Sequence, residues 1–278
     1  MCELLGISCS AKIRPTRYFA AFRRRGKEFR DGGGNPDGWG IALYPGGKAA
    51  VQLFKEALPA ASSRLAKFVF LKYEHLRSKV FVAHVRKASR GIVAYRNTHP
   101  FCREVMGRDY AFAHNGTIRN SRRFALGRFQ PVGGTDSERL FCYLLNYIEE
   151  RCISGWTEED FIDLWKILIG INRKSRDDDK IPNKLNMLLT DGETLICYTD
   201  LYGRGTLHML TLPSCETITG GSVPGASPQG NEMPEKSIGI IATEPLDDDL
   251  GWASMEPGEL CAFRDGVQVF SSGKAAVR

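Results

Sequence analysis

The sequence predicts an α+β protein in which antiparallel sheets pack against helices, and two observations support this fold class. The helical patterns are grouped in the middle of the chain, and the strand patterns on either side often pair with a neighbour along the sequence. A regular alternation of strands and helices would instead indicate a doubly wound parallel sheet. The sequence therefore favours antiparallel sheets over a doubly wound α/β fold.

The N-terminal part combines short strands with one helix and a glycine-rich loop. We expect a strand at 2–7, a helix from about 16 to 27, and then the loop DGGGNPDGWG. Apolar runs predict further strands at 40–44, 51–54, 80–85 and 110–113.

The middle of the chain is more helical, and the last third is typical of hairpins. Thr135 and Glu138 form a capping box that opens one amphipathic helix, and a second is expected at 158–171. An Asp-Gly pair separates the strands of each expected hairpin. These hairpins are 185–189 with 194–198 and 260–263 with 267–270.

The composition is that of an ordinary globular protein, with 42% hydrophobic residues, 25% charged residues and a net charge of +6 over 278 residues. Charged residues interrupt every apolar run, and the N-terminal apolar run is too short for a signal peptide. We therefore expect a cytoplasmic protein without a membrane partner. The basic segment 14–30 carries Phe19 and Phe22 at helical spacing, which favours a helix facing the core over a nucleic-acid surface.

The eight cysteines are scattered and contain no C-x-x-C pair, so we expect free thiols and no disulfide framework. We see no internal repeat and no long linker, and we expect a single domain at 2–278, with the core motifs at 2–140 and helices and hairpins at 141–278.

Cys2 differs from the other cysteines because of its position. Removal of Met1 would leave it with a free α-amine, whose pKa of about 7.8 is far below the value of about 10.4 for lysine. Such an amine can deprotonate the neighbouring thiol without a catalytic histidine. Taken alone, a cysteine at the second position is more often accidental than catalytic.

Five further motifs follow Cys2 in order. They are NPDGWG at 35–40, FVAHVRKAS at 81–89, NTHPF at 97–101, HNG at 114–116 and TDSE at 135–138. Together they resemble the class II glutamine amidotransferases, closely from residue 2 to about 140 and more weakly through 241–246. Small stand-alone members, including the branch that acts on γ-glutamyl compounds, are the most similar.

The resemblance implies a four-layer α/β/β/α sandwich of two antiparallel sheets, the N-terminal-nucleophile (Ntn) hydrolase fold. It also implies roles for particular residues. Cys2 would be the nucleophile, and Asn115 and Gly116 would bind the oxyanion. Arg86 would bind the α-carboxylate of the substrate and Asp136 its α-ammonium group, while Ser89, Thr98 and His99 would line the pocket.

Each of these motifs also has a structural interpretation. Asn115-Gly116 is a common tight turn, and Asp136 can simply be a favourable charge at a helix N-terminus. His84 and His114 are expected to be core histidines with satisfied hydrogen bonds. We expect no metal site, because no ligand pair at zinc spacing accompanies His99 and Cys102. The sequence departs from the family at Lys87, where many members have an aromatic residue, and at Ser89, where many have threonine.

The reaction implied by the resemblance is hydrolysis of a γ-glutamyl amide through a thioester on Cys2, with release of ammonia or an amine and no cofactor. Three interpretations remain open. The chain could supply ammonia to a separate synthase or act with a peptidase subunit. It could be an independent γ-glutamyl amidohydrolase on a substrate other than glutamine, or a catalytically silent binding protein with the same fold.

Overall fold

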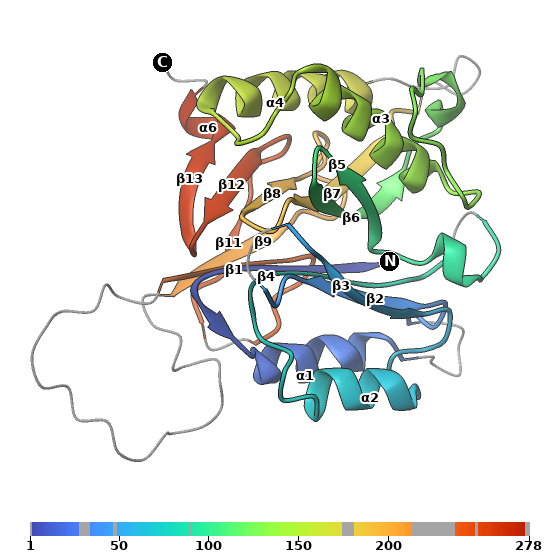
Figure 1. Ribbon diagram of the computed structural model, residues 1–278, viewed down its shortest axis with the longest axis vertical. Coiled ribbons are helices and arrows are strands. Elements are labelled where there is room, and N and C mark those ends of the chain that lie inside the picture. Colours follow the sequence, from blue (N-terminus) through green and yellow to red (C-terminus); the bar gives the residue numbers. More distant parts are fainter. Residues whose placement is uncertain are drawn as a thin grey trace, which may run out of the picture.

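Two antiparallel sheets form the centre of the protein (Figure 1). The computed structural model describes residues 2–27, 34–46, 49–88, 91–173, 181–212, 237–247 and 250–275. The strand order is β11-β9-β10-β1-β4-β2-β3 in a seven-stranded sheet and β13-β12-β8-β7-β6-β5 in a six-stranded sheet.

The bounds of the described elements are as follows. The seven-stranded sheet contains β1 (Glu3–Ile13), β2 (Trp39–Leu43), β3 (Gln52–Glu56), β4 (Ser78–Val85), β9 (His208–Leu212), β10 (Ile238–Ala242) and β11 (Ala253–Ser254). The six-stranded sheet contains β5 (Phe101–Val105), β6 (Arg108–Thr117), β7 (Lys184–Thr190), β8 (Thr194–Tyr198), β12 (Leu260–Arg264) and β13 (Val267–Ser271). The α-helices are α1 (Thr16–Arg25), α2 (Arg64–Leu71), α3 (Asp136–Glu150), α4 (Glu158–Arg173) and α6 (Ser272–Ala275).

The helices cover the outer faces of the sheets, which gives four layers (Figure 1). Helices α1 and α2 pack on the seven-stranded sheet through side chains such as Phe19 and Phe70. Helices α3 and α4 pack on the six-stranded sheet through Phe141 and Leu164. A third apolar cluster, which includes Leu188, fills the space between the sheets. The predicted four-layer α/β/β/α sandwich is therefore confirmed.

Several elements differ from the sequence-based expectations. Strand β1 extends to Ile13, although polar residues interrupt its second half, because its pairing with β4 resumes where Ile13 lies opposite Ser78. The pair Asn115-Gly116 is not a turn, since β6 continues through it and pairs with β7. The unexpected elements are strands β5, β9, β10 and β11 and helices α2 and α6.

The topology brings the ends of several elements together. Cys2 immediately precedes β1, and the pairing of Glu3 with Val85 places it beside Arg86 at the end of β4. Gly116 lies near the end of β6, and Asp136 begins α3. Among the described residues, no helix combines the length and the apolar character that crossing a bilayer requires.

Candidate active site

The thiol of Cys2 is held by the backbone that follows β4. Its sulfur lies 3.2 Å from both the N–H and the carbonyl oxygen of Lys87, so it can accept one hydrogen bond and donate another. Burial raises the pKa of this thiol, although the Lys87 bond and the charge of Arg86 act in the opposite direction. The sulfur therefore needs a base before it can act as a nucleophile at neutral pH.

A cleft opens beside this thiol between the two sheets and the start of α3. It is lined by Cys2, Arg86, Lys87, His99, His114, Gly116, Thr135, Asp136 and Ser137. Its volume of about 30 Å³ is close to that of one water molecule. The enclosed part of the cleft is therefore smaller than a glutamine molecule.

Asn115 and Gly116 approach Cys2 from β6. The side-chain amide of Asn115 donates a 2.6 Å hydrogen bond to the carbonyl oxygen of Cys2. Gly116 packs so closely on β7 that a Cβ atom would lie 2.0 Å from the carbonyl oxygen of Lys184. Only glycine fits this position without a shift of the backbone.

Asp136 lies at the N-terminus of α3, as its sequence context predicts. Thr135 caps the helix by accepting a hydrogen bond of 3.2 Å from the N–H of Glu138. The Oδ2 atom of Asp136 accepts a hydrogen bond of 2.6 Å from the N–H of Ile118, which ties α3 to the residues after β6. The helix dipole further favours a charged carboxylate here.

Arg86 is a buried cation at the cleft. Its side chain donates to the carbonyl oxygens of Gly91 and Ile92 at 3.4 Å each, close to the limit for a hydrogen bond. Burial lowers its pKa, and the negative charge of Asp37 opposes this effect. A substrate carboxylate would be a stronger partner than these two carbonyls, because both partners would then be charged.

Three histidines lie in or beside the cleft. The rings of His84 and His99 are 4.4 Å apart, and their nitrogens have no well-formed hydrogen bond within the described structure. Burial lowers the pKa of His84 to about 3, so this ring is neutral at physiological pH. The expectation of a satisfied His84 is therefore wrong, because neither ring nitrogen makes a well-formed hydrogen bond within the described structure.

His114 is satisfied, as expected. Its Nδ1 atom lies 2.8 Å from Ser137 Oγ and its Nε2 atom lies 3.2 Å from the Lys184 carbonyl. It nevertheless lines the cleft, which the core interpretation did not predict.

The remaining expected residues do not share one location. Thr98 is fully buried and donates its hydroxyl to the Ala94 carbonyl at 3.0 Å, so it is not part of the cleft lining. Ser89 lies outside the described residues. The cleft also contains Thr135 and Ser137, which belong to the same capping motif as Asp136. The capping motif TDSE at 135–138 could therefore have indicated Thr135 and Ser137 as cleft residues.

No group of three or more potential ligands that could hold a metal ion occurs in the part of the chain that the structure describes. The cysteines of that part are all free thiols.

Comparison with known proteins establishes the family. The family described as class-II glutamine amidotransferases matches residues 1–277. The chain belongs to this family. An uncharacterized protein of Methanocaldococcus jannaschii is 38% identical over 98% of this chain and 72% of its own length. The Escherichia coli protein YafJ, whose name assigns it only provisionally to the glutamine amidotransferases, is 34% identical over 97% of this chain and 100% of its own.

Solved structures agree with this assignment to the class II glutamine amidotransferases. A Pseudomonas aeruginosa structure described as a predicted glutamine amidotransferase has a TM-score of 0.64 at 28% identity, and the match covers 97% of this chain and 100% of that one. Glutamine phosphoribosylpyrophosphate amidotransferase from Bacillus subtilis has a TM-score of 0.60 at 18% identity and matches 97% of this chain and 48% of that chain. The second likeness shows the shared fold.

Proposed function

We propose that this class II amidotransferase hydrolyses the side-chain amide of glutamine, or of another γ-glutamyl compound, through a γ-glutamyl thioester on Cys2. The observation that carries the proposal is the shared cleft, in which the Cys2 thiol, the Arg86 guanidinium and the Asp136 carboxylate lie together. These groups provide a nucleophile and opposite charges for the two charged ends of an amino acid. Residues 2–278 would act as one catalytic domain.

In the proposed reaction, the α-amine of Cys2 takes the thiol proton after Met1 has been removed. The sulfur then bonds to the amide carbon, and the carbonyl oxygen becomes an oxyanion that Asn115 and the Gly116 N–H stabilise. The C–N bond breaks as the ammonium returns its proton to the leaving nitrogen. Water next cleaves the thioester and restores the thiol, so the products with glutamine are glutamate and ammonia.

Arg86 and Asp136 would fix the substrate by its α-carboxylate and α-ammonium groups. A guanidinium presents two parallel N–H donors to a carboxylate. The Oδ1 atom of Asp136 can accept an ammonium proton while Oδ2 keeps its bond to Ile118. His99 would form part of the pocket wall, because it lines the cleft with both groups.

The test is an amidase assay with glutamine and with a γ-glutamyl amide of a larger amine, on protein whose N-terminal mass has been verified. The proposal expects turnover that Cys2→Ala abolishes, and labelling of Cys2 by a glutamine-mimicking electrophile, located by mass mapping. Preference for the larger amide would indicate an independent amidohydrolase. Turnover retained by Cys2→Ala would overturn the assignment of Cys2 as the nucleophile. The absence of both turnover and labelling would overturn the proposed reaction and leave the silent binding protein.

A further inference from the structure

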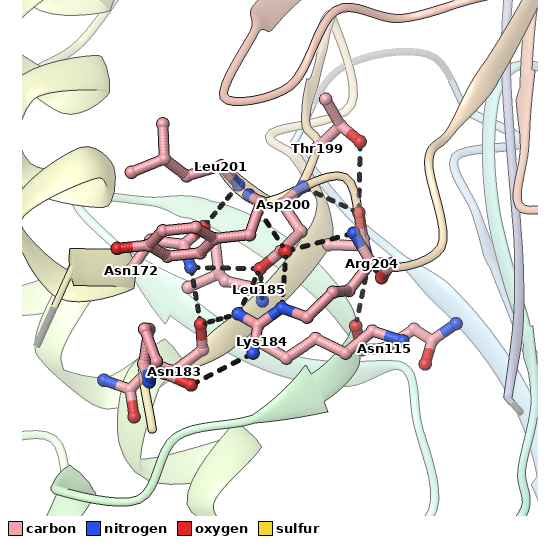
Figure 2. A network of polar contacts seen from close by, with 12 residues as sticks. Asn115, Asn172, Asn183, Lys184, Leu185, Thr199, Asp200, Leu201 and Arg204 are labelled. Atoms are coloured by element: carbon pink, nitrogen blue, oxygen red, sulfur yellow. Dashed lines mark hydrogen bonds and ion pairs between the residues drawn. The ribbon is translucent and has the colours of Figure 1, made fainter. Parts of the chain in front are cut away.

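A buried polar network lies beside β7 and reaches Asn115 on β6 (Figure 2). Asp200 lies at its centre, immediately after the β8 region, and is fully buried. The other fully buried polar members are Asn172, Asn183, Asn186 and Thr199. Burial of a charge is costly unless the charge is fully hydrogen-bonded. A buried carboxylate with this many partners therefore suggests a specific structural role for Asp200.

The structural role of Asp200 follows from the different lengths of the strands on the two sides of β7. The pairing of β7 with β8 runs from Thr190 back to Met187 and stops there, whereas the pairing of β7 with β6 continues to Lys184. Residues 184–186 therefore lack a β8 partner at the point where they hold Asn115 and Gly116. Asp200 replaces the missing strand, since its Oδ1 atom accepts the N–H of Leu185 at 3.0 Å.

Arg204 holds the Asp200 carboxylate in a two-pronged ion pair. Its Nε and Nη2 atoms each lie 3.0 Å from one carboxylate oxygen. Arg204 also donates to the carbonyl oxygens of Asn183 at 2.5 Å and Pro182 at 3.2 Å, the residues that lead into β7. Burial alone would raise the pKa of Asp200, but the bonds from Arg204, Asn172 and the Leu185 N–H together lower it.

Asn186 connects this cluster directly to Asn115, its partner in the β6–β7 ladder. Its side-chain oxygen accepts the N–H of Asp200 at 2.8 Å and the hydroxyl of Thr199 at 3.2 Å. Its side-chain nitrogen donates to the carbonyl oxygens of Asn115 and Arg204 at 3.4 Å each. Two routes, through Leu185 and Asn186, thus run from Asp200 to the pair expected to bind the oxyanion.

We propose that Asp200 is a positioning residue that, through Leu185 and Asn186, fixes the end of β6 so that Asn115 and the Gly116 N–H face the carbonyl oxygen of the reacting amide. The inference rests on the proposed function, because it assigns Asp200 to the geometry of that oxyanion site. An oxyanion donor must lie within a few tenths of an ångström of its best position, and a displacement of about 1 Å can cost about a hundredfold in rate.

The experiment compares Asp200→Asn with Asp191→Asn. Asp191 is a matched control, because it is 2% exposed, lies 3.4 Å from an arginine (Arg108) and accepts backbone N–H groups at the opposite end of β7. We expect both variants to lower the melting temperature. Asp200→Asn alone should lower kcat by about tenfold to a hundredfold, with KM changed less than about threefold.

Two further measurements keep the outcome decisive. In an Asn115→Ala background, Asp200→Asn should lower kcat by less than it does in the parent protein. The reason is that the Asn115 amide, one of the two donors that Asp200 would position, is then absent. If Asp200→Asn does not fold, Asn186→Ser takes its place and should show the same split between kcat and KM. Equal kcat for the Asp200 and Asp191 variants, or fully independent effects of Asp200 and Asn115, would overturn the inference.

Amide hydrogen exchange separates this inference from the proposed function, because it needs no turnover. Asp200→Asn should speed exchange at Leu185 and Gly116, and Asp191→Asn should not. Unchanged exchange in an active enzyme defeats the positioning role alone. If the parent protein has no amidase activity but Asp200→Asn still speeds exchange, Asp200 does hold β6 and β7 in place and the proposed reaction is wrong.

Discussion

The side-chain amide of Asn115 donates to the carbonyl oxygen of Cys2 at 2.6 Å, so the expected oxyanion donor is bonded to the backbone of the proposed nucleophile. This contact orders the N-terminal residue beside Gly116 before any substrate is present. During the reaction the same NH₂ group would have to donate a hydrogen bond to the substrate oxygen. It could do so by rotating away from Cys2, or by using one N–H for each acceptor. Asn115 would therefore both order Cys2 and stabilise the oxyanion, and substitution can test these two roles.

Replacing Asn115 by alanine should lower kcat for amide hydrolysis by about 10²–10³-fold, because one oxyanion donor is lost. KM should change less, since Arg86 and Asp136 remain to bind the substrate. Steady-state kinetics with glutamine measure both constants. A kcat within a few-fold of the parent value would show that Asn115 only orders Cys2.

Retention of Met1 should lower the rate by at least about 10²–10⁴-fold, the usual contribution of general acid–base catalysis. The α-amine of Cys2 would then be part of a peptide bond, and the thiol, whose pKa burial already raises, would have no base. The comparison uses two samples of verified N-terminal mass. Equal turnover would identify another group as the base, even if Cys2 remained the nucleophile.

Gly116→Ala and Gly170→Ala should change stability in opposite directions. A Cβ on Gly116 would lie 2.0 Å from the Lys184 carbonyl, so the β6–β7 ladder must shift and the free energy of unfolding should fall by about 1–3 kcal/mol or more. Gly170 lies inside α4 with nothing within 4 Å of its Cβ position, and alanine there should stabilise by roughly 0.5–1 kcal/mol. Urea unfolding measures both. A neutral Gly116→Ala would contradict the close packing.

Stability should fall on the acid side because of His84. Its folded-state pKa of about 3 lies below the ordinary value of 6.5, so below pH 6.5 the unfolded chain binds a proton that the folded protein does not. The cost grows as the pH falls from 6.5 towards 3 and is about 2 kcal/mol at pH 5.

The matching variant is His84→Gln, which removes the titrating ring. Urea unfolding at pH 7.5 and pH 5.0 should show a smaller loss of stability in the variant. Glu3, whose pKa burial raises to about 7, gives the opposite slope over much of this range, but it is present in both proteins. The same pH dependence in parent and variant would mean that His84 is protonated within the fold.

The sequence predicted those parts of the fold and site that depend on short segments. The capping motif at Thr135 located the start of α3, and the apolar run before Arg86 located β4. The order of the motifs indicated the family, which in turn implied the four layers.

The parts that the sequence did not reveal depend on contacts between distant segments. Asp200 lies in the segment YTDLYG, where an aspartate is typical of a turn, and only the early end of β8 makes it a partner of Leu185. Thr98 belongs to a matching motif, but the local 3₁₀ turn directs its hydroxyl to Ala94. His84 has the pattern of any inward-facing strand residue, and its lack of partners follows from what packs around it.

The central place of β1 in its sheet also sets the order in which the protein can assemble. Strand β1 is synthesised before the other strands of its sheet, yet it is flanked by β10, with Leu5 opposite Ala242. The residues that line the cleft all precede residue 138, but β1 keeps an open edge until the chain has been made to about residue 243. Pairings of such long sequence separation form slowly. Amidase activity should therefore appear late in synthesis or refolding, and it would report that the last quarter of the chain has joined the first strand.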